Sequence, residues 1–369
     1  MANQAKASRS AGRDGPFALV LSDTHSLHRV RDRGYVERPE RIATLLEAVS
    51  GLGLFARLPV RHFGDGHILA VHDRDFVLYL KEVCETLGRS ESVYPDVFPL
   101  RRQDRLPRDL AARAGYYCID AFTPLDDSAY QAARAAVDVA LTAADAVLHG
   151  RPVAYALCRP PGHHAERRAF GGFCYFNNAA IAAHFLSRHG RAAVLDIDFH
   201  HGNGTQDIFY ERGDVLTLSI HGDPAYAYPH FSGFADETGV GAGEGGNRNF
   251  PLPEQADEAL YLRVLARAAR LIERADPTFL VVSLGLDTMK GDQAGAFALR
   301  AESLRRVGRR LGRLGLPTLV VQEGGYNRRN LRRGGAAFFA GMAEAMGEPT
   351  GFAAKSKTPE SRRTKVTTK

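Results

Sequence analysis

The chain has 369 residues, of which 44% are hydrophobic and 24% are charged, and its formal net charge is +6. A soluble globular chain of this length buries a full core without disulfides, and the lack of any run near ~18 apolar residues excludes a membrane-spanning helix. Residues 1–14 carry +2 and residues 355–369 carry +5, which leaves −1 for the body and predicts no specific nucleic-acid partner.

The ends of the chain differ from its body. Residues 1–14 and 353–369 are polar and without periodicity, so we expect two disordered tails, the second basic, around a single domain at 15–352. The first residues contain no apolar core of a secretion signal. The cysteines are scattered without a C-x-x-C pair, which is typical of a reducing compartment and predicts a cytoplasmic protein.

Apolar runs rich in Val, Leu and Ile alternate along the body with Ala/Leu/Arg stretches of helical period. In chain order, the predicted elements are a strand at 17–22, a helix at 129–149, a strand at 153–158, a helix at 176–189, strands at 192–198 and 215–220, a helix at 257–275, a strand at 279–285, a helix at 300–314 and a strand at 318–324. This alternation predicts an α/β fold, an open parallel sheet with helices on both faces.

One segment breaks the alternation. Residues 87–115 contain three prolines and many charges, which predicts a long irregular insertion. Insertions of this length in a compact domain are usually functional or lie at interfaces.

Residues of unusual chemistry follow the predicted strands. Side chains alternate faces on a strand, so Asp196, Asp198 and His200 project to one side. Carboxylates this close repel one another unless a cation or a shared proton lies between them. With Asp287 from another strand end, Asp198 and His200 offer three donors and leave a position open, the pattern of a catalytic metal site. The alternative is that the aspartates cap loops and the histidines only pack.

The turn after the strand at 153–158 carries two adjacent histidines, His163 and His164. We expect them to act in acid–base chemistry beside the metal, with their rings oriented by Asp196 and Asn203. The alternative is a surface loop with two solvated rings. Tyr326 follows two glycines after the last strand, where its hydroxyl would donate to a developing oxyanion or simply pack in the core.

The motifs in their order resemble those of the histone deacetylase superfamily. They are RPPGHHA at 159–165, GGFCYFNNAAIAA at 171–183, LDIDFHHGNGTQDIFY at 195–210, SLGLDT at 283–288 and EGGYN at 323–327. The stretch HGDPAYAYPHFSGFADETG at 221–239 is similar to the class II-like branch that contains the bacterial acetylpolyamine amidohydrolases.

The resemblance implies an arginase/deacetylase-type fold with an eight-stranded parallel sheet. It implies one Zn²⁺ held by Asp198, His200 and Asp287, with His163, His164 and Tyr326 as the catalytic residues. It also implies a structural K⁺, held by Asp196, Ser219 and the main-chain carbonyls of Asp198, His200 and Ile220.

The substrate would lie in a slot. Phe173 and Tyr228 follow strand ends, and we expect them, with Gly172, to bind the substrate's methylene chain, although ordinary packing would also explain the two rings. Polyamine-specific relatives carry acidic residues around positions 106–122. This chain has Ala111 and Phe122 where two of them align, with Asp109 and Asp120 nearby as substitutes.

The sequence therefore predicts a zinc-dependent amidohydrolase that removes acetyl or similar acyl groups from N-acetylated amines, with acetylpolyamines as the leading substrates. The alternatives are deacetylation of acetyl-lysine in proteins or peptides and, on the same fold, a dinuclear manganese amidinohydrolase of the arginase type. The resemblance further implies a homodimer in which the insertion at 87–115 contacts the partner and narrows the entrance to the active site.

Overall fold

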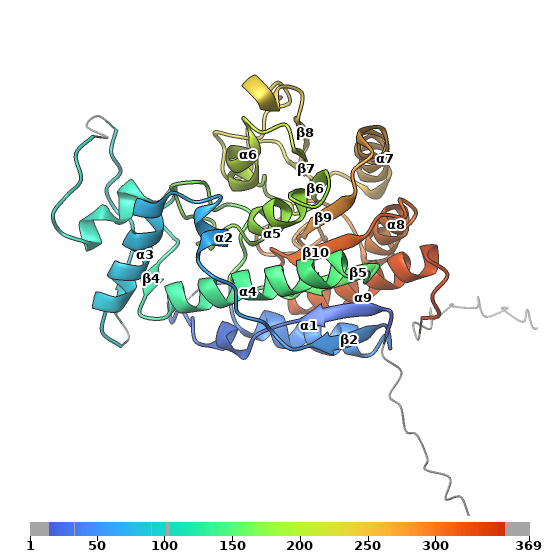
Figure 1. Ribbon diagram of the computed structural model, residues 1–369, viewed down its shortest axis with the longest axis horizontal. Coiled ribbons are helices and arrows are strands. Elements are labelled where there is room, and N and C mark those ends of the chain that lie inside the picture. Colours follow the sequence, from blue (N-terminus) through green and yellow to red (C-terminus); the bar gives the residue numbers. More distant parts are fainter. Residues whose placement is uncertain (1–14, 33, 90, 101–103, 351–369) are drawn as a thin grey trace, which may run out of the picture.

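An eight-stranded sheet forms the centre of the fold, and all of its neighbouring strands run parallel (Figure 1). The computed structural model describes residues 15–32, 34–89, 91–100 and 104–350, so the two expected tails lie outside the described residues. The sheet order is β2-β1-β5-β10-β9-β6-β7-β8. The strands are β1 (Phe17–Val20), β2 (Phe55–Leu58), β5 (Val153–Ala156), β6 (Ala192–Asp196), β7 (Val215–Gly222), β8 (Asn247–Leu252), β9 (Phe279–Leu284) and β10 (Thr318–Gln322).

Helices cover both faces of this sheet. They are α1 (Glu40–Ser50), α2 (Gly66–Leu69), α3 (Arg74–Thr86), α4 (Ala129–Leu148), α5 (Asn178–Ser187), α6 (Asn203–Phe209), α7 (Glu258–Ala275), α8 (Ala301–Gly312) and α9 (Arg328–Ala345), with 3-10 turns η1 (Asp23–Ser26), η2 (Ala111–Tyr116) and η3 (Gly241–Gly243). One face packs against α4 and α5 together with α2 and α3, and the other packs against α1, α7, α8 and α9. None of the described helices is long and apolar enough to cross a bilayer.

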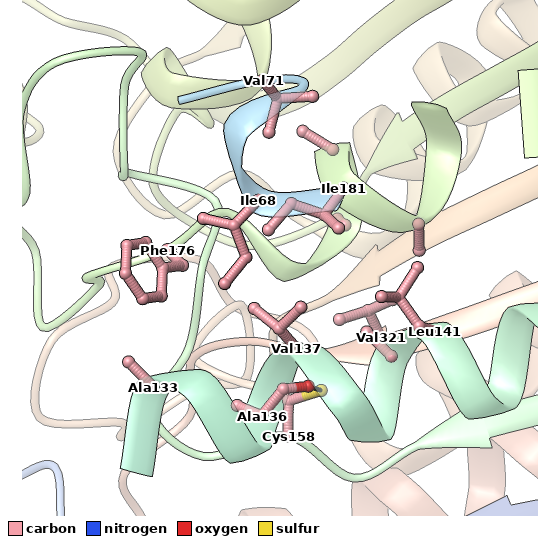
Figure 2. Close-up of a cluster of buried hydrophobic side chains, with 14 of the residues drawn as sticks. Ile68, Val71, Ala133, Ala136, Val137, Leu141, Cys158, Phe176, Ile181 and Val321 are labelled. Atoms are coloured by element: carbon pink, nitrogen blue, oxygen red, sulfur yellow. Dashed lines mark hydrogen bonds between the residues drawn. The ribbon is translucent and has the colours of Figure 1, made fainter. Parts of the chain in front are cut away.

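The central strands are mostly apolar because their side chains contribute to two cores. In β5, Ala154 and Ala156 join the core beneath α4 and α5, whereas Val153 and Tyr155 join the core on the opposite face. This alternation is the period-two pattern of a strand that is buried on both sides. Figure 2 shows the first core, where residues of α2, α4, α5 and β10 meet.

The predicted α/β fold and the predicted elements are confirmed, and several elements were missed. Strand β8 carries polar residues and Pro251, a pattern that does not look like a buried strand. It lies at the edge of the sheet, where a proline without an N–H group is tolerated. Helix α9 contains three glycines, which weaken the local helical signal. Gly341 is needed there, because a Cβ atom would lie 1.9 Å from the carbonyl oxygen of Arg305 in α8.

The segment at 87–115 has little regular structure in its described part. Within it, the short strand β3 (Ser92–Val93) pairs antiparallel with β4 (Leu125–Asp126), which follows the segment in the chain. Its apolar side chains are unusually open to solvent, with Val97 72% and Leu100 90% exposed. An apolar surface of this kind is typical of a contact region.

Candidate active site

The order of the strands explains why distant residues meet. Strands β5, β10, β9 and β6 are successive neighbours, and their carboxyl ends lie at the same edge of the sheet. The loop after each strand carries one group of candidate residues. His163 and His164 follow β5, Tyr326 follows β10, Asp287 follows β9, and Asp198 and His200 follow β6. Ligands bind at this edge in open parallel sheets.

Asp198, His200 and Asp287 bring their donor atoms within 4.8 Å of one another. His200 Nδ1 lies 3.3 Å from Asp198 Oδ1 and 3.2 Å from Asp287 Oδ2. Both carboxylates are fully buried, and Asp287 Oδ2 forms no hydrogen bond with any described residue. Burial and the charge of Asp198 raise the pKa of Asp287 to about 7. Two buried carboxylates and an imidazole at this range fit a divalent metal ion, which would offset their repulsion.

Backbone amides hold the two carboxylates in place. Gly324 N donates to Asp198 Oδ2 at 2.7 Å, and Phe199 N donates to Asp287 Oδ1 at 3.1 Å. The donor set is therefore positioned by the protein itself.

The adjacent histidines lie side by side, with their ring centroids 4.0 Å apart, and have different partners. His163 Nδ1 donates to Asp196 Oδ2 at 2.9 Å, and His164 Nδ1 lies 2.7 Å from Asn203 Oδ1. Burial disfavours a charge on His163, but the carboxylates of Asp196 and Asp198 outweigh it and raise its pKa to about 10. Burial and the charge of His163 lower the pKa of His164 well below its usual value. These surroundings favour the charged form of His163 and the neutral form of His164.

A second group of potential metal donors consists of His163, Cys174 and Glu323. The side chains of Cys174 and Glu323 form hydrogen bonds with the protein backbone. Burial raises the pKa of the Cys174 thiol well above its usual value, and the thiol donates to the carbonyl of Gly172. Glu323 Oε2 accepts hydrogen bonds from the backbone amides of Gly162 and His163 at 2.6 and 3.1 Å. Glu323 thereby fixes the turn that carries the two histidines, a role that the sequence did not reveal.

A hollow of about 120 Å³ leads to these groups. It is lined by Phe122, His164, Gly172, Phe173, His200, Tyr228, Ala294 and Tyr326. Gly172 has a φ of +54°, and a Cβ atom there would lie 2.1 Å from His164 Cδ2. Only glycine therefore lets the wall approach the histidine. Burial raises the pKa of the Tyr326 phenol well above its usual value, so its hydroxyl remains a donor.

Asp120, one of the two carboxylates expected as substitutes for the missing acidic residues, is engaged by groups of the protein itself. Asp120 is 7% exposed, and its carboxylate accepts hydrogen bonds from Gly172 N at 2.6 Å and from the Tyr228 hydroxyl at 3.0 Å. It ties together the two walls of the hollow. The exposed residue at this rim is Phe122, at 43%. Asp109 is exposed, and its carboxylate accepts a hydrogen bond from Ala112 N.

The side chains expected around potassium come from two paired strands. Asp196 and Ser219 are direct neighbours across the β6–β7 pairing, and Ile220 follows in β7. Ser219 Oγ lies 2.7 Å from His221 Nδ1, while Asp196 Oδ1 accepts a hydrogen bond from Asp198 N.

Comparisons with known proteins identify the family to which this chain belongs. A sequence model described as the histone deacetylase domain matches residues 35–342. The chain belongs to the histone deacetylase domain family. Family membership confirms the predicted resemblance and sets aside the arginase-type alternative.

Individual members of the histone deacetylase family cover most of the chain. Acetylpolyamine amidohydrolase 2 of Pseudomonas aeruginosa is 43% identical over 83% of this chain and 93% of its own length. The histone deacetylase-like amidohydrolase of the same organism is 33% identical over 85% and 78%. The crystal structure of acetylpolyamine aminohydrolase from Burkholderia pseudomallei superposes with a TM-score of 0.84 at 39% identity, covering 89% of this chain and 99% of that one.

Behind the tyrosine of this histone deacetylase domain lies a buried charge network. Glu37 Oε1 accepts hydrogen bonds from Arg41 Nη1 at 2.7 Å and Arg159 Nε at 2.9 Å, and all three side chains are almost fully buried. Arg41 Nε donates to the carbonyl of Gly325 at 2.6 Å, and its guanidinium lies 4.9 Å from the Tyr326 ring centroid. Sequence reasoning missed this network because buried charges look like surface charges in a sequence.

Replacing Glu37 tests how much the fold depends on this network. Glu37→Ala leaves two buried guanidiniums without a counter-charge, so we expect a loss of about 3–5 kcal/mol in the free energy of unfolding. Glu40→Ala is the matched control, since Glu40 is 46% exposed and pairs with the exposed Arg29. It should change stability by less than about 1 kcal/mol. Denaturant unfolding measures both, and equal losses would contradict the role given to Glu37.

Proposed function

We propose that this chain is a zinc-dependent amidohydrolase that releases acetate from N-acetylated polyamines. The observation that carries the proposal is the meeting of a buried Asp–His–Asp donor set with a histidine pair at the end of an apolar hollow. The relatives named acetylpolyamine amidohydrolase, over 40% identical across most of the chain, support the substrate class.

In this proposal Asp198, His200 and Asp287 hold the zinc ion. When bound, the ion supplies Lewis-acid polarisation of the amide carbonyl and lowers the pKa of the attacking water. A carboxylate-rich site with one imidazole and an open position fits a catalytic zinc centre.

The remaining groups have separate tasks. His164 is neutral because of its burial, so it takes the proton of the attacking water and later returns it to the leaving amine. His163, whose charge Asp196 favours, stabilises the negative charge that develops beside it. The Tyr326 hydroxyl donates to the oxyanion of the tetrahedral intermediate. Phe173 and Tyr228 contact the methylene chain of the substrate.

We also propose that Asp196 and Ser219 hold a structural K⁺ together with the main-chain carbonyls of Asp198, His200 and Ile220. Their adjacency across the β6–β7 pairing supports this assignment.

Deacetylation of acetyl-lysine side chains is the second candidate function. It is favoured by the lining of the hollow, which includes no acidic residue in the described chain. An acetyl-lysine side chain needs an apolar slot but no carboxylate for a second amine.

A substrate panel tests the proposed function. The zinc-loaded protein should release acetate from acetylputrescine, acetylcadaverine and acetylspermidine faster than from an acetyl-lysine peptide, and a chelator should abolish the activity until zinc is restored. Asp287→Ala should lose both zinc and activity, since one donor of three is gone, whereas the exposed Asp236→Ala should keep both. A faster reaction with the peptide would favour the second function, and full activity of metal-free protein would overturn the metal site.

Tyr326→Phe tests the oxyanion donor. Removing one hydroxyl that acts in the transition state should lower kcat by about 100- to 1,000-fold with little change in KM or zinc content. Tyr210→Phe, outside the hollow, is the matched control and should behave as the wild type. An unchanged kcat in Tyr326→Phe would remove this residue from the mechanism.

We further propose that the insertion at 87–115 pairs two copies of the chain and restricts the entrance to slim substrates, with Tyr94 and Phe98 among the contacts. The exposure of Val97 and Leu100 supports an apolar contact there. A stable dimer would bury at least about 1,000 Å² in total.

Light scattering tests the dimer. The intact protein should have the mass of two chains, and a variant that carries Val97→Glu and Leu100→Glu should be monomeric and accept bulkier acetylated peptides. Phe231→Glu changes an equally exposed residue outside the insertion and should stay dimeric. A monomeric wild type would refute the proposal, and so would a dimeric double variant that still rejects bulky peptides.

A further inference from the structure

Asn203, which faces His164, has a second partner on its far side. Asn203 Oδ1 lies 2.7 Å from His164 Nδ1, and Asn203 Nδ2 lies 2.7 Å from Glu166 Oε1. The same Nδ2 also donates to the backbone carbonyl of His164 at 3.3 Å. Glu166 lies only two residues beyond His164, in the same turn.

These contacts settle which end of the amide faces the histidine. An asparagine side chain accepts with its oxygen and donates with its nitrogen. Two acceptors, Glu166 Oε1 and the His164 carbonyl, lie at one end of Asn203, so the nitrogen belongs there. The oxygen then faces the ring, and His164 Nδ1 must carry the hydrogen. Nε2 is left with a free lone pair, as a base requires.

The opposite orientation would remove this base. It would place the amide oxygen against two other acceptors and direct an N–H group at His164 Nδ1. The ring would then carry its hydrogen on Nε2, and its remaining lone pair would point at Asn203. The wrong tautomer of a histidine base is catalytically incompetent even when the geometry is intact.

We propose that Glu166 is a positioning residue, which acts through Asn203 to hold His164 as the tautomer that is protonated on Nδ1. This inference deepens the proposed function and rests on it, since the base matters only if His164 moves a proton. Glu166 itself does not line the hollow.

The orientation does not depend on the charge of Glu166. Burial and the nearby Asp207 raise the pKa of Glu166 to about 7. The carbonyl oxygen of a neutral carboxylic acid accepts from an amide nitrogen as a carboxylate does. What Glu166 contributes is an acceptor at a fixed place.

Two substitutions at one position separate the acceptor from the rest of the side chain. Glu166→Leu removes the acceptor at similar volume and should lower kcat up to about 10-fold, the equivalent of one hydrogen bond, with KM nearly unchanged. Glu166→Gln keeps an accepting oxygen and should restore most of the kcat that Glu166→Leu loses. Glu211→Leu, at an exposed position, is the control and should leave kcat unchanged. If Glu166→Leu does not fold, Glu166→Ala takes its place with the same expectation.

A second-site change distinguishes positioning from structural support. Asn203→Asp in the Glu166→Leu background puts an acceptor oxygen before His164 Nδ1 whichever way the group turns. This double variant should therefore recover kcat relative to Glu166→Leu. A structural role of Glu166 predicts no recovery. Wild-type kcat in Glu166→Leu, or a double variant as impaired as Glu166→Leu, would overturn the proposal.

The tautomer of His164 can also be measured by NMR, independently of enzymatic activity. In ¹⁵N spectra of the histidine-labelled zinc enzyme, with the His164 signals assigned by their loss in His164→Phe, the wild type should show hydrogen on Nδ1. Glu166→Leu should show a mixture of tautomers. Hydrogen on Nε2 in the wild type, or an unchanged spectrum in Glu166→Leu, would overturn the proposal. If the wild type hydrolyses no acetylated amine, the proposed function fails, while this measurement still decides the role of Glu166.

Discussion

The rest of this site depends on one constraint, which is that two buried carboxylates lie close to each other. Asp198 and Asp287 are fully buried, and each is fixed by a backbone amide that prevents it from turning away. Such a pair is stable only with a proton or a cation between its members. The nearby residues are suited to this requirement. His200 completes the set of metal donors, and the ring of His163 lies next to Asp198.

Support for the site comes from charged groups that the fold buries around it. Glu323 fixes the histidine turn through two backbone amides, and Arg41 contacts both the carbonyl before Tyr326 and the ring of Tyr326. Glu37 compensates the charge of Arg41 and links it to Arg159, in the turn that leads to the histidines. The loops after β5 and β10 are therefore held by one connected set of polar contacts.

The sequence predicted the parts of this molecule that follow from local pattern. Strands such as β5 and β9 are almost entirely apolar. The Asp-x-His spacing made Asp198 and His200 candidate metal ligands, although β6 ends at Asp196 and both residues lie in the loop that follows. The edge strand β8 and the glycine-containing α9 escaped detection because their contacts arise only in the folded chain. The contacts of Asp120 likewise arise only in the folded chain. A carboxylate near a binding site looks available in a sequence, and only the fold shows that its oxygens are already bonded.

The position of Asp120 has a consequence for how this chain can change its preference among substrates. One carboxylate joins the wall at Gly172 to the wall at Tyr228, so neither wall can shift without disturbing the other. The width of the hollow is thus a property of the framework and resists gradual adjustment. Phe122, exposed at the rim and free of such bonds through its side chain, can be exchanged without that cost. Selection for new substrates would then change residues at the rim, such as Phe122, and leave the walls of the hollow unchanged.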